Sequence, residues 1–92
     1  MLKHNSYFDA KVQSVAFERN GRKQTVGVIA PGEYHFKTDA PERMTVVSGE
    51  LHARMAGGEW HVYPAGTTFE VVGKSGFDVS AAHPSAYWCE FL

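Results

Sequence analysis

The strongest constraint on the fold is an alternation of apolar and polar residues with a period of two, as in MTVVS (44–48) and FDVSA (77–81). Successive side chains of a β-strand point to opposite faces, so this period predicts strands with one buried face. No segment shows the i, i+3, i+4 apolar stripe of an amphipathic helix. Strands are predicted over residues 11–18, 24–30, 33–38, 43–48, 50–56, 59–63, 67–72, 77–82 and 85–91.

Turn signals separate the predicted strands. Asn20-Gly21, Pro31-Gly32, Gly57-Gly58 and Pro64-Ala65-Gly66 combine residues that favour positive φ with residues that preset φ near −65°. The chain of 92 residues is long enough for one core, and its 43% hydrophobic content excludes disorder. Many short strands in so small a chain predict a single all-β domain over residues 1–92, closed as a sandwich or barrel that leaves few free edges.

Composition narrows the functional classes. A formal net charge of −1 gives no basic field for nucleic acid, so no nucleic-acid partner is expected. Cys89 is the only cysteine, which excludes an intrachain disulfide and a thiolate metal cluster. The first ten residues, MLKHNSYFDA, lack the apolar stretch of a signal peptide, and no segment is apolar enough to span a membrane. A cytoplasmic protein without a membrane partner is therefore expected, with a loose N-terminus around His4.

Two spaced motifs resemble those of the cupins, which are small double-stranded β-helix (jelly-roll) barrels. In the first, GVIAPGEYH (27–35) carries Glu33 and His35 where the family pattern has a His-x-His pair, and ERMTVVSG (42–49) supplies the following Glu and Gly. In the second, GEWHVYPAGTTF (58–69) keeps the Gly and the Pro-x-Gly but ends on Phe69, where the family pattern has a fourth metal ligand. The gap between His35 and Glu42 is longer than usual for the family.

The resemblance implies that Glu33, His35, Glu42 and Phe69 converge inside the barrel, since residues 33, 35 and 37 share one face of their strand. Tyr34 and Phe36 then fall on the opposite face. Two of the four expected ligands are replaced, although one imidazole and two carboxylates could still hold a divalent ion. This leaves open a metal site formed by Glu33, His35 and Glu42.

A closer resemblance covers almost the whole chain. The segments PGEY (31–34), PERMTVVSGEL (41–51), AGTTFEV (65–71) and YWCEFL (87–92) together are similar to the small cupin-type pyrimidine/purine nucleoside phosphorylases. This implies a pentosyltransferase of broad specificity that cleaves purine and pyrimidine nucleosides with phosphate, releasing free base and pentose 1-phosphate. Inorganic phosphate is then the co-substrate, and neither a metal nor another cofactor is expected.

This chemistry suggests roles for particular residues. Glu33 and Glu42 are predicted to hold the ribose hydroxyls and to favour the positive charge that develops on the sugar, and His35 to donate to phosphate or to the leaving base. Met44 and Phe69 are predicted to contact the base. Phosphate needs hydroxyls and cations, and the sequence does not choose among the candidates, which are Thr38, Thr45, Ser48, Ser75, Lys11, Lys37 and Arg43.

The sequence also leaves two alternative functions open, and it predicts a homodimer. One function is a metal-dependent cupin oxygenase or isomerase; the other is a non-catalytic module that binds a sugar or nucleoside. Cys89 is expected to be a buried small apolar residue. A homodimer is expected because so small a barrel gains core by association, with Tyr34, Phe36 or Trp88 at the interface.

Overall fold

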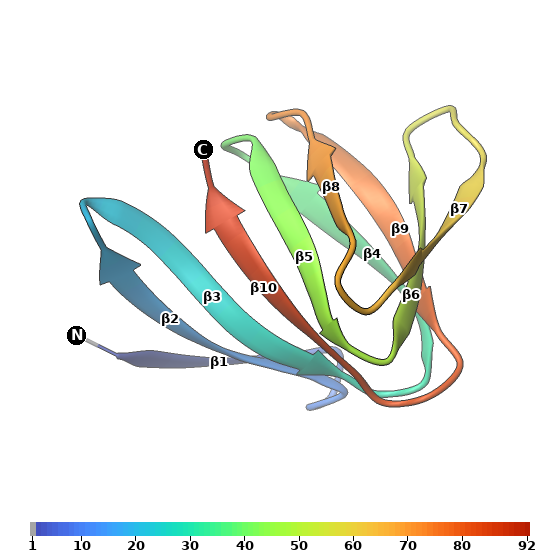
Figure 1. Cartoon of the computed structure of the whole chain (residues 1–92), viewed down its shortest axis with the longest axis horizontal. Coiled ribbons are helices and arrows are strands. Elements are labelled where there is room, and N and C mark those ends of the chain that lie inside the picture. Colours follow the sequence, from blue (N-terminus) through green and yellow to red (C-terminus); the bar gives the residue numbers. More distant parts are fainter. Residues whose placement is uncertain (1) are drawn as a thin grey trace.

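The computed structural model describes residues 2–92 as ten antiparallel strands (Figure 1). They are β1 (Lys3–Tyr7), β2 (Val12–Arg19), β3 (Arg22–Ile29), β4 (Gly32–Thr38), β5 (Glu42–Ser48), β6 (Glu50–Met55), β7 (Trp60–Pro64), β8 (Thr68–Val71), β9 (Ser75–Ala81) and β10 (Ser85–Phe91). Residues 2–92 include no helix of the length and hydropathy that a membrane-spanning segment requires.

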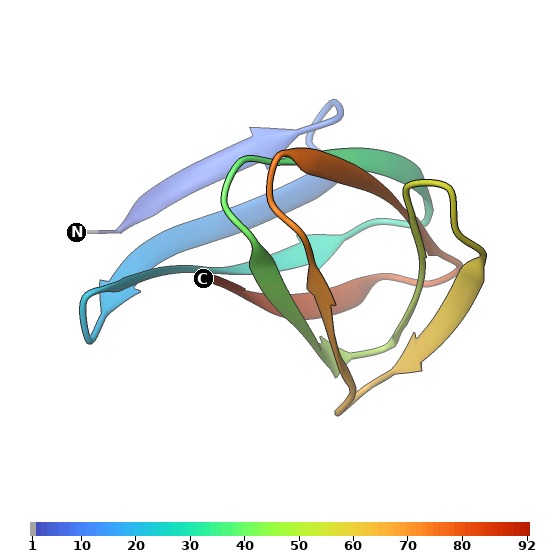
Figure 2. The same ribbon diagram turned by 90° about the horizontal axis from the view of Figure 1, so that it is seen from above.

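The strands form two facing sheets. One has the order β1-β2-β3-β10-β5-β8 and the other the order β4-β9-β6-β7. Figure 2, seen from above, shows the smaller sheet curving over part of the larger one, while β1, β2 and β3 extend beyond it as a wing. This arrangement confirms the predicted all-β cupin (jelly-roll) fold. Fully buried side chains of both sheets meet between them, among them Ile29, Val46, Leu51, Phe77 and Val79.

All nine predicted strands are present, and β1 is an additional one. The expectation of a loose terminus around His4 was wrong, because residues Lys3 to Tyr7 pair with residues Ala16 to Val12 of β2. The sequence KHNSY is polar and lies almost entirely exposed at the edge of the sheet, so it carries no apolar alternation. Backbone pairing, which leaves no signal in side-chain pattern, forms this strand.

The face that β4 turns to the interior is the reverse of the predicted one. Tyr34 is 5% exposed and Phe36 packs against the core, whereas Glu33 and His35 are exposed. Tyr34 also donates a hydrogen bond from its hydroxyl to the carbonyl oxygen of Ala30, at 2.8 Å. Burial of two large aromatic rings stabilises this register far more than burial of a carboxylate and an imidazole would. Tyr34 is therefore a core residue and not the interface residue that was predicted, and Phe36 is partly buried against the core at the inner face of β4.

The two turns at the opposite ends of β2 differ in strain. Asn20 and Gly21 have φ values of 53° and 72°, which is the geometry of a type I′ hairpin with its preferred Asn-Gly pair. The β1–β2 turn instead places Phe8, Asp9 and Ala10 at φ values of 53°, 55° and 67°. Left-handed backbone costs a non-glycine residue roughly 1–2 kcal/mol, so three in succession make a strained turn. Phe8 nevertheless packs on Tyr34 with 5.1 Å between ring centroids.

Candidate active site

An open cleft of about 290 Å³ lies where the wing separates from the smaller sheet; it is called the apolar cleft below. Its floor is the inner face of β2, β3, β5 and β10, and β4, β9 and the β1–β2 turn form the opposite side. Most of its surface is aromatic or aliphatic, with a few polar groups at defined positions. The lining residues are Tyr7, Phe8, Ser14, Thr25, His35, Phe36, Lys37, Glu42, Met44, Phe77, Tyr87, Cys89 and Phe91.

Glu42 is the one carboxylate in the lining of the apolar cleft. It is the first residue of β5 and lies between Phe91 of β10 and Val71 of β8. Burial raises the pKa of Glu42 above its ordinary value, and a hydrogen bond from the Cys89 thiol to Oε1, at 3.3 Å, opposes this rise only in part. Its carboxyl group therefore takes up a proton at a higher pH than a solvated carboxylate does.

Cys89 and Tyr87 line the floor beside Glu42. Burial raises the pKa of the Cys89 thiol, so the thiol stays protonated, which is the state in which it donates to Glu42; the expected buried, apolar role of Cys89 is confirmed. Burial also raises the pKa of Tyr87 to about 12, and the nearby Ser14 opposes this rise only in part. Gly27 lies opposite Tyr87, and a β-carbon there would come within 2.6 Å of the tyrosine ring. The glycine that begins the first motif therefore makes room for the floor of the cleft.

Aromatic rings connect the cleft to the core. Phe36 stacks on Phe77 with 5.6 Å between centroids, and Phe77 meets Phe69 edge-on at 6.2 Å. Phe69 then stacks on Tyr63 at 4.4 Å. Phe69, which replaces the fourth ligand of the family pattern, is 6% exposed and lies behind Phe77, outside the lining of the cleft. It supports the wall, and the lining has in its place the partly buried Phe36 and, behind it, the buried Phe77.

A second hollow, of about 310 Å³, lies on the outer face of the smaller sheet; it is called the cationic hollow below. Asp78 of β9 is at its centre, accepting hydrogen bonds from Nδ1 of His35 at 2.9 Å and from Nε and Nη2 of Arg54 at 3.1 and 2.9 Å. The His35 and Arg54 hydrogen bonds hold the pKa of Asp78 below its usual value. The lining residues are His35, Lys37, Arg54, Ala56, Lys74, Ser75, Gly76, Phe77 and Asp78.

The predicted site residues divide between these two places and the rest of the surface. Glu42 and Met44 line the apolar cleft, Ser75 lines the cationic hollow, and His35 and Lys37 line both. Glu33 is exposed and lines neither. The prediction that Glu33, His35, Glu42 and Phe69 converge was wrong, because β4 turns its other face inward.

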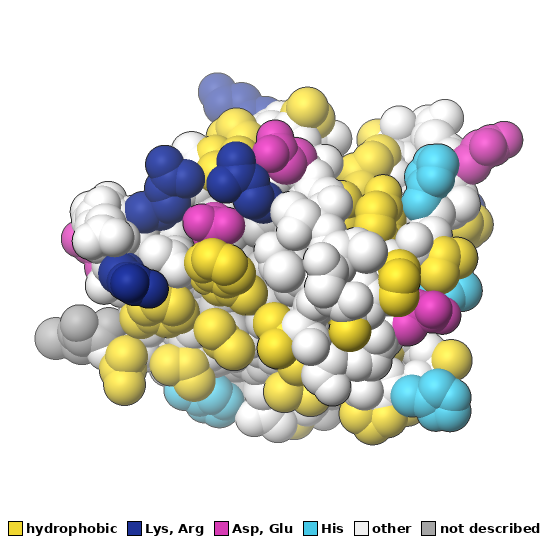
Figure 3. All heavy atoms as spheres, in the orientation of Figure 1, with side chains coloured by type: hydrophobic (Ala, Val, Ile, Leu, Met, Phe, Trp, Pro, Cys, Tyr) yellow, Lys and Arg dark blue, Asp and Glu magenta, His cyan; other side chains and the backbone are white. Residues whose placement is uncertain are grey.

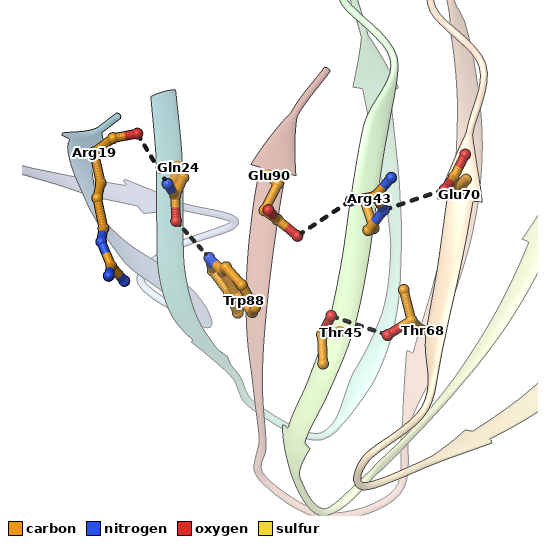
Figure 4. A network of polar contacts seen from close by, with 8 residues as sticks. All are labelled: Arg19, Gln24, Arg43, Thr45, Thr68, Glu70, Trp88 and Glu90. Atoms are coloured by element: carbon orange, nitrogen blue, oxygen red, sulfur yellow. Dashed lines mark hydrogen bonds and ion pairs between the residues drawn. The ribbon is translucent and has the colours of Figure 1, made fainter. Parts of the chain in front are cut away.

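The remaining candidates are engaged elsewhere. Thr38 is buried, donating to the carbonyl oxygen of Val72 at 2.8 Å and accepting from the Ser75 amide at 3.0 Å. Figure 4 shows Arg43 between Glu70 and Glu90, and Thr45 bonded to Thr68, on the larger sheet. Ser48 and Lys11 are exposed and line neither hollow.

The metal site that the sequence left open finds no geometric support. Among residues 2–92, no group of three or more His, Cys, Asp or Glu side chains is placed to hold a metal ion. Glu33 points to solvent, His35 is bound to Asp78, and Glu42 lies inside the apolar cleft. The chain therefore does not assemble the predicted ligand set.

Sequence reasoning missed most of the cleft. Phe36 and Phe77 belong to strands it predicted, and the signal that could have placed them is the apolar alternation of Tyr34 and Phe36 on one strand and of Phe77, Val79 and Ala81 on the other. Tyr7 and Phe8 belong to a strand and a turn it did not predict. Ser14, Thr25 and Tyr87 are polar side chains on an inner face, and no local pattern distinguishes such positions from core positions.

Comparisons with known proteins agree with this architecture and extend it. Residues 2–91 match the family described as Pyrimidine/purine nucleoside phosphorylase. A pyrimidine/purine nucleoside phosphorylase of Sorangium cellulosum is 71% identical over the full length of both chains, and one of Anaeromyxobacter is 62% identical over all of this chain and 89% of its own. The crystal structure of a Vibrio parahaemolyticus protein of unknown function is 45% identical, with a TM-score of 0.97 over 100% of this chain and 99% of that one. The chain belongs to the pyrimidine/purine nucleoside phosphorylase family.

Proposed function

We propose that the chain is a pentosyltransferase that cleaves purine and pyrimidine nucleosides with inorganic phosphate. The base and ribose occupy the apolar cleft, and Glu42 faces the sugar. The observation that carries this assignment is a single half-buried carboxyl group in a mostly apolar cleft, in a chain whose relatives are named nucleoside phosphorylases. The products are free base and pentose 1-phosphate.

The reaction needs two bond changes at C1′ of the sugar. The bond from C1′ to the base nitrogen breaks with its electron pair going to the base, and an oxygen of hydrogen phosphate forms the new bond to C1′. The proton of hydrogen phosphate ends on the base. Positive charge develops on the sugar between these events, so a carboxylate held in a site of low dielectric stabilises the transition state more than the ground state.

Glu42 can do this in its ionised form. Ribose hydroxyls donate hydrogen bonds to the carboxylate, and the positive charge of the sugar compensates for the hydration that the carboxylate loses on burial. Met44 from the same strand and the stacked rings of Phe36 and Phe77 offer flat apolar surface to the base. Such a wall has few directional contacts, which suits both purines and pyrimidines.

The reaction as proposed needs no metal ion and no organic cofactor. Charge on the sugar is met by Glu42, and the only co-substrate is phosphate. We assign the reaction to the cytoplasm, where the unpaired thiol of Cys89 suits a reducing environment. Fractionation of cells that produce the protein from its own promoter tests this location, and recovery outside the cytoplasmic fraction contradicts it.

We also propose that the protein is a homodimer, formed through the outer face of the larger sheet. Val15, Val26, Val28 and Val47 are each at least 39% exposed there, around the half-buried Trp88. Figure 3 shows hydrophobic side chains gathered over this sheet, with Lys, Arg, Asp and Glu side chains gathered above them. Face-to-face packing of two such sheets across a two-fold axis would cover this surface with the same surface of a second copy.

Light scattering measures the assembly directly. The native protein is expected at twice its chain mass of 10.2 kDa, and Val26→Lys is expected to shift it to the monomer mass. A monomeric native protein at micromolar concentration would remove the dimer proposal without affecting the assignment of the cleft.

The activity is tested by incubating chelator-treated protein with a panel of nucleosides, with and without phosphate, and separating the products by chromatography. The expected result is free base and pentose 1-phosphate that form only when phosphate is present. Ligand binding without turnover would favour the non-catalytic module, and turnover that returns only on addition of a divalent metal would favour a metal-dependent enzyme.

A further inference from the structure

We propose that the cationic hollow binds the phosphate group, as hydrogen phosphate before the reaction and as the phosphoryl group of pentose 1-phosphate after it. The inference rests on the proposed function, because it places one of the two substrates of that reaction. It assigns Lys37, Lys74 and His35 as the phosphate ligands. The sequence alone could not choose among several candidate cations and hydroxyls.

Charge favours an anion in this hollow. Lys37, Arg54 and Lys74 contribute three positive side chains to its lining, against the single carboxylate of Asp78. Asp78 is already bonded to Arg54 and His35, whereas neither Lys37 nor Lys74 forms an ion pair within the described part of the chain. Two ammonium groups are therefore available for a doubly charged ligand.

Contacts within the protein hold the side chains of the cationic hollow in place without a bound ligand. The Arg54 guanidinium lies over the Trp60 ring, 4.6 Å from its centroid, while it bonds Asp78. The hydrogen bond from His35 Nδ1 to Asp78 leaves Nε2 as the ring nitrogen that can contact a ligand. Asp78 is thus a positioning residue, since it orients two side chains of the hollow without meeting the phosphate itself.

Backbone groups next to the hollow are engaged. The Lys74 amide donates to the carbonyl oxygen of Asp39 at 3.0 Å, and the Ser75 amide donates to Oγ1 of Thr38, also at 3.0 Å. These two bonds hold the end of β4 against the start of β9. A phosphate here would be bound by side chains, namely the ammonium groups, the His35 ring and the Ser75 hydroxyl.

The position of the hollow suits transfer to a sugar in the apolar cleft. His35, Lys37 and Phe77 line both spaces, so the two spaces adjoin at these residues of β4 and β9. A phosphate held by Lys37 and His35 lies at the edge of the site that holds the sugar. The alternative cation Arg43 does not share this property, because it lies between Glu70 and Glu90 on the outer face of the larger sheet (Figure 4).

The test is a comparison of Michaelis constants in charge-neutral variants. Lys37→Met and Lys74→Met are each expected to raise the KM for phosphate about tenfold or more, as the loss of a hydrogen bond to a charged group predicts. The KM for the nucleoside is expected to stay within about twofold. Lys3→Met, on the exposed strand β1, makes the same change of charge away from both spaces and is expected to leave both constants unchanged.

A second measurement separates this proposal from the proposed function. Amide signals in an NMR titration of the native protein with inorganic phosphate are expected to shift saturably at residues 35–37 and 74–78. If they do so while no nucleoside is cleaved, the phosphate site stands and the phosphorylase assignment falls. If nucleosides are cleaved while these signals do not shift and both lysine variants keep the native KM for phosphate, the phosphate site is overturned and the assignment stands.

Discussion

The apolar cleft and the cationic hollow adjoin each other, but the carboxyl group in each has its pKa shifted in the opposite direction. Glu42, in the apolar cleft, has its pKa raised by burial, and its one side-chain partner is a neutral thiol. Asp78, in the cationic hollow, has its pKa lowered, first by the hydrogen bond from His35 and then by that from Arg54. The two groups are chemically alike, so the difference comes entirely from what surrounds them.

This difference separates a group that can take part in a reaction from one that organises its neighbours. A carboxyl group without an ionic partner changes its hydrogen bonding when a cationic sugar forms beside it, which is the condition for transition-state stabilisation. A carboxylate already bonded to an arginine and a histidine has little capacity left for a ligand. A perturbed pKa does not itself identify a catalytic group, because ion pairs that only support the structure also shift pKa values; the cause of the shift and the position of the group in a cleft have to be considered with it.

The largest expected effect is the loss of turnover in Glu42→Gln. The amide keeps the shape but cannot carry the negative charge, so kcat is expected to fall about 100-fold or more while the protein stays folded. Steady-state assays with uridine or inosine and phosphate measure this loss. Glu59→Gln, at an exposed position, is the matched control. Turnover in Glu42→Gln within a few-fold of the native value would remove Glu42 from the mechanism.

The same assay tests the second predicted carboxylate. Glu33 is exposed on the outer side of β4, so Glu33→Gln is expected to cost much less turnover than Glu42→Gln. An equal loss of turnover in both variants would support the prediction that Glu33 and Glu42 both act on the sugar. It would also require β4 to turn its other face inward when substrate binds.

The protonation of Glu42 sets the pH dependence. Because its pKa is raised and its ionised form is the active one, kcat/KM is expected to decline as the pH falls through a value above 4.5, the ordinary pKa of this side chain. The remaining activity of Glu42→Gln is expected to lack this decline. A decline with rising pH that depends on Glu42 would instead identify the protonated form as the active one.

Substitution of one glycine beside each space by alanine tests how tightly the side chains there are packed. A β-carbon at Gly27 would lie 2.6 Å from the buried ring of Tyr87, and one at Gly76 would lie 2.7 Å from Nε2 of the exposed His35. Tyr87 is only 6% exposed and would have to leave its packed position in the floor of the apolar cleft, so Gly27→Ala is expected to destabilise the protein by about 2 kcal/mol. His35 can rotate into solvent, so Gly76→Ala is expected to change stability by less than about 1 kcal/mol.

Urea unfolding measures both changes, and the phosphate assay adds a second distinction. Gly76→Ala displaces His35 from the cationic hollow, so it is expected to raise the KM for phosphate although it barely changes stability. Similar stability losses in the two variants would mean that the wall of the cationic hollow is as rigid as the floor of the apolar cleft.

The fold could be predicted from the sequence because its evidence is local. Alternation and turn chemistry place nine strands, and Asn20-Gly21 forms the hairpin turn that its residue types favour. Strand β1 could not be predicted, since KHNSY is exposed and pairs through its backbone. The left-handed turn at Phe8, Asp9 and Ala10 could not be predicted either, because these residue types do not require positive φ.

The site was predictable only in part, since it depends on which face of β4 is buried. The spacing of the cupin motif puts Glu33 and His35 at ligand positions, while the apolar alternation puts Tyr34 and Phe36 inside. These two signals conflict in one strand, and burial of the two rings decides between them. On β5 the signals agree, and there the predictions for Glu42 and Met44 as residues of one inner face are confirmed.

The smallest expected effect, and the one that compares the two carboxyl groups most directly, is the pH dependence of stability. Asp78 has a lowered pKa, so it contributes stability above pH 3.8, its ordinary value, and this contribution is lost as the pH falls through the lowered value. Glu42 has a raised pKa, so its contribution is present below 4.5 and is lost as the pH rises through the raised value.

Urea unfolding of Asp78→Asn and Glu42→Gln over a series of pH values measures these opposite signs. The stability of the native protein relative to Asp78→Asn is expected to shrink toward low pH, and its stability relative to Glu42→Gln to shrink toward neutral pH. The Asp78 effect is small because the group is near solvent and its ion pairs are screened. Slopes of the same sign in both comparisons would mean that burial does not dominate at Glu42, and the case for Glu42 as the reactive group would lose its physical basis.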